Sequence, residues 1–132
     1  MSASIIDPWC NNPPKNLIRH ECGHAYSMIE FGAVEVAIYH DGHSWRSDPN
    51  WGDTQPDERA VAAGWLGALA VPEYMSAEDE IVCRTIPLKM EFEILTELDS
   101  VFDYVRSMTD EQIQNLIDGA KNGIITIQSR EL

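Results

Sequence analysis

The segment His20-Glu21-Cys22-Gly23-His24 constrains the fold of this chain more than any other stretch of its sequence. Two histidines four residues apart meet on a helix, where positions i and i+4 share one face with Cβ atoms roughly 6 Å apart. Two imidazoles placed in this way can bind one zinc ion at about 2.0–2.1 Å each. Glu21 lies about 100° around the helix from His20, so it flanks the ion and can accept a proton from water.

The sequence around this motif predicts the helix that the motif requires, over residues 13–31. Asn12 is a good N-cap, Pro13 and Pro14 suit a first helical turn, and Gly32 suits a C-terminal stop. One face of this helix should line a cleft and carries Leu17, His20, Glu21, His24 and Met28. The adjacent face should enter the core and carries Ile18, Cys22, Ala25 and Ile29.

Gly23 lies inside the predicted helix, where glycine costs about 1 kcal/mol relative to alanine. We expect a structural reason for it, and close approach of another backbone is the reason that glycine serves best. The small residues of the apolar segment 60–70 would allow such close packing.

The remaining pattern predicts a mostly α fold with one small β-hairpin. Alternation favours a strand over 34–39, and Asp41-Gly42 favours a two-residue turn into a partner strand over 43–47. In this register His40 and His43 oppose each other directly. Residues 48–56 read as a surface loop, and 124–127 as an added strand. The other predicted helices span 57–70, 77–85, 88–106 and 110–121, with capping boxes at Ser76–Asp79 and Thr109–Gln112 and a stop at Asn122-Gly123.

The length of 132 residues suits one domain. We expect an irregular segment over 1–12, a zinc-site core over 13–86 and acidic C-terminal helices over 87–132. The net charge of −13 argues against binding to nucleic acid or to an anionic membrane. Three cysteines without a CxxC spacing, the absence of a signal-peptide pattern and an apolar run (60–72) too short to span a bilayer predict a cytoplasmic protein.

A catalytic zinc site needs a third protein ligand, and this ligand must be distant in the sequence from the two histidines. Spacing alone does not choose among the candidates, which are His40, His43, Glu73, Glu78, Asp79 and Glu80. Asp79 also has an ordinary structural role, because the capping box of the helix over 77–85 would use its side chain.

The segment His20-Glu21-Cys22-Gly23-His24-Ala25 resembles the HEAGHA motif of FtsH-type zinc proteases, with Cys22 in place of the usual alanine. In that family a short β segment, a small-residue helix and an aspartate ligand follow the motif. Here the segments 34–47, 64–68 and 76–79 fall in that order. The resemblance implies a compact, zincin-like metallopeptidase domain in which Asp79 completes the zinc site.

The expected activity is therefore hydrolysis of peptide bonds by metal-activated water, with Glu21 as general base, His20, His24 and Asp79 as ligands, and Zn²⁺ as cofactor. The sequence shows neither the ATPase phosphate loop nor the membrane anchor of the FtsH-type proteases, so we expect a stand-alone domain. Its substrate would be a peptide or an unfolded protein segment, and a homo-oligomer or a partner unfoldase is compatible with this activity. The alternative is a non-catalytic, zinc-stabilised acidic module that binds a basic protein partner.

Overall fold

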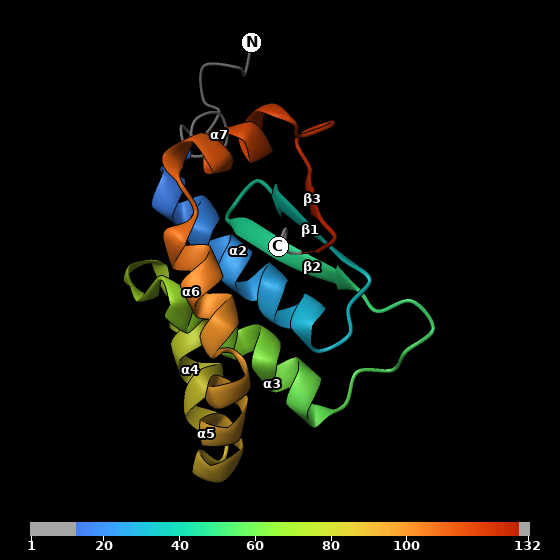
Figure 1. Cartoon of the computed structure of the whole chain (residues 1–132), viewed down its shortest axis with the longest axis vertical. Coiled ribbons are helices and arrows are strands. Elements are labelled where there is room, and N and C mark those ends of the chain that lie inside the picture. Colours follow the sequence, from blue (N-terminus) through green and yellow to red (C-terminus); the bar gives the residue numbers. More distant parts are fainter. Residues whose placement is uncertain (1–12, 130–132) are drawn as a thin grey trace.

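The structure is a computed structural model that describes residues 13–129 (Figure 1). The irregular segment expected over 1–12, with the N-cap expected from Asn12, lies outside the described residues. The prediction of a mostly helical fold with a small β-hairpin is confirmed. The described part of the chain has α-helices on one side of helix α2 and a three-stranded antiparallel sheet on the other.

Helix α2 (Lys15–Glu30) carries the HExxH segment through the centre of the molecule. It begins two residues later than predicted, because a residue that precedes a proline is disfavoured in helical conformation, and Pro13 precedes Pro14. Pro14 is itself extended, with φ −57° and ψ 142°, and its carbonyl accepts the N–H of Leu17. The two predicted faces are confirmed. Ile18, Cys22 and Ala25 are fully buried in the core.

The sheet has the strand order β2-β1-β3, so β2 lies at an edge. Strand β1 (Glu35–His40) pairs antiparallel with β2 (Trp45–Asn50) and with β3 (Ile125–Ile127). The added strand predicted near the C-terminus is thus confirmed. The prediction of a loop from residue 48 was wrong, because β2 continues to Asn50. Pro49 is tolerated there since an edge strand needs no outward N–H.

The predicted two-residue turn and the opposition of His40 and His43 were also wrong. His40 pairs with Trp45, and four residues form the connection. The carboxylate of Asp41 accepts the backbone N–H groups of His43 and Ser44 at 2.8 and 2.9 Å. This local Asx-type arrangement lengthens the loop and sets the register.

The segment predicted as one helix over 57–70 forms helix α3 (Glu58–Leu66) followed by a 3₁₀ helix, η2 (Gly67–Ala70). Asp57 caps α3 by accepting the Ala60 N–H at 2.8 Å. The change to a 3₁₀ helix coincides with the point where Gly67 meets α2. A second 3₁₀ helix, η3 (Pro72–Tyr74), leads to helix α4 (Ala77–Thr85), whose predicted boundaries are confirmed.

The close approach predicted at Gly23 is confirmed. A Cβ atom on Gly23 would lie 2.4 Å from the carbonyl oxygen of Gly67 and 3.0 Å from the Cβ of Ala70. These distances are too short for any side chain, so glycine at position 23 allows α2 and η2 to touch. The contact fixes the distance between the HExxH segment and the chain that leads to α4.

The helix predicted over 88–106 is two helices, α5 (Leu88–Glu97) and α6 (Asp99–Ser107). Leu98 separates them with φ −86° and ψ −1°, and no glycine or proline marks this bend in the sequence. The bend keeps the apolar face of both helices against the core. The predicted core residues are fully or largely buried, with Met90 only partly so: Ile94, Leu98, Val101, Phe102 and Val105.

Helix α7 (Asp110–Asp118) ends three residues earlier than predicted. Asn122 and Gly123, expected as its stop, instead form a tight turn with φ of 55° and 77°. This turn joins Lys121 to Ile124, which form an isolated bridge, and leads into β3. Both predicted capping boxes are present, at Ser76–Asp79 and Thr109–Gln112. Among the described helices, none has the length and apolar character needed to cross a bilayer.

Candidate metal centre

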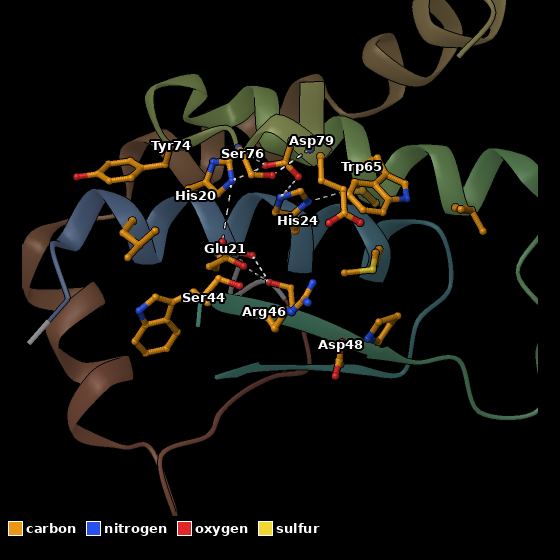
Figure 2. A pocket seen from close by; sticks show the side chains of 18 of the residues that line it. His20, Glu21, His24, Ser44, Arg46, Asp48, Trp65, Tyr74, Ser76 and Asp79 are labelled. Atoms are coloured by element: carbon orange, nitrogen blue, oxygen red, sulfur yellow. Dashed lines mark hydrogen bonds and ion pairs between the residues drawn. The ribbon is translucent and has the colours of Figure 1, made fainter. Parts of the chain in front are cut away.

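His20 and His24 project from one face of α2 towards Asp79, which lies in the first turn of α4 (Figure 2). The ligand atoms of the three side chains all lie within 4.8 Å of one another, so this group could hold a metal ion. The Nε2 of His20 lies 3.3 Å from Asp79 Oδ2, and the Nε2 of His24 lies 3.5 Å from Asp79 Oδ1. Residues 59 positions apart in the chain thus meet at one point.

The other nitrogen of each imidazole binds a backbone carbonyl. His20 Nδ1 lies 2.8 Å from the carbonyl oxygen of Val71, and His24 Nδ1 lies 2.7 Å from that of Gly64. A carbonyl oxygen only accepts, so each Nδ1 must carry the proton. In the neutral rings, the lone pairs of both Nε2 atoms then face the carboxylate of Asp79. Lone pairs facing a carboxylate repel it unless a proton or a metal ion lies between them, and a metal ion could occupy this position.

The distances also fit an ion. In a tetrahedral site with ligand bonds of about 2.0–2.1 Å, two ligand atoms lie about 3.3–3.4 Å apart. The two nitrogen–oxygen distances, 3.3 and 3.5 Å, are close to this spacing, although each histidine faces a different oxygen of Asp79. A charge-assisted hydrogen bond between the same groups would be shorter, at about 2.7–2.9 Å.

Asp79 forms the predicted capping box and also faces the two motif histidines. Its Oδ2 accepts the backbone N–H of Ser76 at 3.0 Å, and its own N–H donates to Ser76 Oγ at 3.0 Å. The carboxylate is buried and still offers lone pairs to both histidines. The helix cap therefore fixes the orientation of the carboxylate that faces the imidazoles.

The other candidate ligands lie elsewhere. Within residues 13–129, the group of possible ligands contains Asp79 and none of the acids Glu73, Glu78 or Glu80, all of which are exposed. His40 stacks edge-on with Trp45 in the hairpin, and His43 is exposed in its loop. The structure thus brings together the two motif histidines with Asp79.

Glu21 is buried beside this group without joining it. Its Oε2 lies 4.0 Å from His20 Nε2, and its Oε1 accepts a hydrogen bond from Ser47 Oγ of β2 at 2.8 Å. Burial raises the pKa of Glu21 above its ordinary value, although His24, His20 and the Ser47 hydroxyl oppose this shift. A carboxylate with a raised pKa next to a metal site is suited to accept a proton near neutral pH.

The pKa values of His24 and Asp79 are shifted because their side chains lie close together in a buried site. Burial alone would lower the pKa of His24, but the carboxylates of Asp79 and Glu21 outweigh burial and raise it. For Asp79, burial acts to raise the pKa, and the adjacent imidazoles of His20 and His24 outweigh burial and hold the pKa far below the usual range. Asp79 is therefore a carboxylate anion at neutral pH, as a metal ligand must be.

The site opens onto a cavity of about 690 Å³ between α2, β2, α3 and α4. All five residues of the predicted cleft face of α2 line it, which confirms that prediction. The opposite wall is β2, from Trp45 to Pro49. Apolar side chains lie around the polar centre, and the ring of Trp65 meets that of His24 edge-on at 6.5 Å between centroids. A small extended molecule could therefore reach the group from outside.

No protein-family model, curated protein or solved structure matches this chain.

Three contributors to the site were not predicted from the sequence. Ser47 binds Glu21, and the carbonyls of Gly64 and Val71 hold the histidine rings. Every residue has a backbone carbonyl, so the sequence does not show which of them will bind a histidine ring. Ser47 lies on the same face of β2 as Trp45 and Pro49 by alternation, but only the packing of the sheet against α2 shows that this face meets Glu21.

Proposed function

We propose that this chain is a zinc-dependent peptidase that hydrolyses peptide bonds in unfolded or flexible protein segments. The observation that carries the proposal is the arrangement of His20, His24 and Asp79 around one point, with the buried carboxylate of Glu21 beside them, in the wall of an open cavity. The resemblance of residues 20–25 to the FtsH-type motif supports the same proposal.

The donor set favours zinc. Two imidazole nitrogens and one carboxylate oxygen form a common ligand set of catalytic zinc sites, which leave a further position open. Bound Zn²⁺ would supply Lewis-acid chemistry, polarising the scissile carbonyl and lowering the pKa of water. The same donor set also suits ferrous iron, so the metal is part of the test.

In this proposal Glu21 moves the proton. Its Oε1 is held by Ser47, which leaves Oε2 directed to the side of the histidines. Oε2 accepts a proton from the attacking water and then donates it to the nitrogen of the departing amine. Burial of Glu21 favours the protonated form between these steps, because the neutral acid is the form that a dry site prefers.

Strand β2 supports the choice of an extended substrate. It is an edge strand, and its residues 45–49 line the cavity opposite the ligand group. An extended peptide can pair with such an edge through main-chain hydrogen bonds. Folded proteins rarely offer a free extended segment, so unfolded or flexible segments are the expected substrates.

The test compares the wild-type chain with Glu21→Gln. We expect about one zinc per chain in both proteins by elemental analysis, and turnover of unfolded casein that falls about 10²–10⁴-fold in the variant. A chelator should abolish wild-type turnover, and zinc should restore it. Equal turnover in the two proteins would exclude Glu21 as the base. A wild-type protein that binds zinc and cleaves no unfolded substrate would instead support the acidic binding module.

A further inference from the structure

Helix α5 has a largely exposed apolar face, of which Leu95 also packs against the core. Leu88 is 83% exposed and Phe92 is 74% exposed, the two largest values among the large apolar residues of the described chain. Both lie on the helix farthest from the sheet (Figure 1). A contiguous exposed apolar patch, especially one bordered by polar residues, can mark a site of protein–protein interaction.

The spacing shows that this face is separate from the buried one. Leu88, Phe92 and Leu95 follow positions i, i+4 and i+7, which form one stripe along a helix. Ile94 and Leu98, both fully buried, face the core on another side. Helix α5 is therefore apolar on two faces, and α3 covers only one of them.

A shallow hollow continues the stripe. It has a volume of about 350 Å³ and is lined by Phe92, Leu95, Thr96 and Asp99. A hollow beside an exposed aromatic ring can receive an apolar side chain of another helix, as in helix-in-groove recognition.

Two acidic residues, Glu91 and Asp99, border the stripe. Glu91 lies one turn from Leu88, and Asp99 lies at the end of the hollow. Glu93 and Glu97 lie further around the helix and pair with Arg59 of α3 at 3.9 and 3.4 Å. Lys89 is the single basic residue of α5. The rim of the apolar face is thus negative.

This charge decides between two kinds of occupant. A second copy of the chain would place a like-charged rim against this one, and each chain carries a net charge of −13. Juxtaposed like charges disfavour association. A partner with basic residues on both sides of an apolar stripe would match both the apolar centre and the acidic rim.

We propose that the stripe Leu88–Phe92–Leu95 is a docking site for a basic amphipathic helix of another protein. Apolar side chains of the partner enter the hollow beside Phe92, and its lysines or arginines face Glu91 and Asp99. This site is separate from the metal centre and does not depend on the proposed peptidase activity.

The experiment measures binding of two labelled synthetic peptides by fluorescence anisotropy. Both are amphipathic helices with the same leucine stripe, flanked by arginines in one and by glutamates in the other. We expect the wild-type chain to bind the basic peptide only, with an affinity that falls as salt is added. Phe92→Ser should weaken binding by at least about tenfold, as should Leu88→Ser. Val34→Ser is the matched control, because Val34 is 56% exposed and directly precedes β1, away from α5.

Circular dichroism and thermal unfolding show whether each variant is folded. Equal binding of the two peptides, or equal affinity of Phe92→Ser and wild type, would overturn the proposal. So would a wild-type dimer in sedimentation analysis that becomes a monomer in Phe92→Ser without any binding of the basic peptide. That last result would assign the face to a second copy of the chain.

Discussion

Gly23 and Gly67 meet backbone to backbone, and a Cβ atom on either residue would lie 2.4 Å from the carbonyl oxygen of the other. The contact joins α2 to η2 between the two carbonyls that hold the histidine rings, those of Gly64 and Val71. The geometry of the candidate metal centre therefore depends on glycine at both positions.

Alanine at position 67 should separate these segments. We expect Gly67→Ala to lower the free energy of unfolding by about 1–3 kcal/mol or more, because its Cβ meets backbone atoms that cannot move independently. The measurement is the midpoint of urea unfolding, together with zinc affinity, which should fall as well. Gly119→Ala is the milder comparison, since its Cβ would lie 3.1 Å from Asn115 O at a helix end, against 2.4 Å from Gly23 O for Gly67→Ala. Equal midpoints for the two variants would contradict the tight contact.

The two roles of Asp79 can be separated by mutation. Ser76→Ala removes one hydrogen bond of the capping box and should cost about 1 kcal/mol of stability, with little change in metal affinity. Asp79→Asn loses the carboxylate that faces both histidines, so metal affinity should fall by more than about a hundredfold. Isothermal titration with zinc and thermal unfolding of the metal-free proteins distinguish these effects. If Ser76→Ala impairs zinc binding as much as Asp79→Asn, the cap is needed to build the site.

Metal affinity should depend on pH through the proton on His24. The carboxylates of Asp79 and Glu21 raise the pKa of His24 above 6.5, so this ring is more often protonated near neutral pH than a free histidine. A ligand must lose its proton before it binds an ion. Zinc affinity should therefore rise as pH increases through the neutral range, with release of protons on binding. Competition titrations at several pH values test this, and an affinity independent of pH would contradict it.

Ser47 should tune the proposed base. Its hydroxyl donates to Glu21 Oε1 and favours the charged carboxylate, while burial opposes it. Removing the hydroxyl in Ser47→Ala should raise the pKa of Glu21 further. Because the base acts only when it is deprotonated, the acidic limb of the pH–rate profile should move to higher pH. Ser44→Ala, at another position in the cavity lining, should leave the profile unchanged. A shift to lower pH in Ser47→Ala would disprove this role.

Helix α2 and its two faces could be predicted from the sequence because they follow from local spacing. The capping boxes at Ser76 and Thr109 were equally local, since each involves residues three positions apart. The prediction of the hairpin register was wrong because of the Asp41 side chain. Its two hydrogen bonds favour a longer loop than the Asp-Gly pair suggests. The bend at Leu98 has no signal in residue type.

The centre itself was only partly predictable. His20 and His24 meet through helical periodicity, whereas the position of Asp79 beside them depends on the contact of α2 with η2 and on the short η3 that follows. Spacing could not choose between Asp79 and its neighbours Glu78 and Glu80. In the folded chain Asp79 is buried, whereas Glu78 and Glu80 are exposed.

The end of helix α3 has a consequence for the electronic state of His24. Because α3 stops at Leu66, Gly64 belongs to its last turn, where carbonyl groups lack a partner further along the helix. One of these free acceptors binds His24 Nδ1 and thereby selects the tautomer whose other nitrogen can donate electrons to an ion. A single-residue insertion that moved this helix end would turn the ring or shift its proton, without changing any side chain of the site.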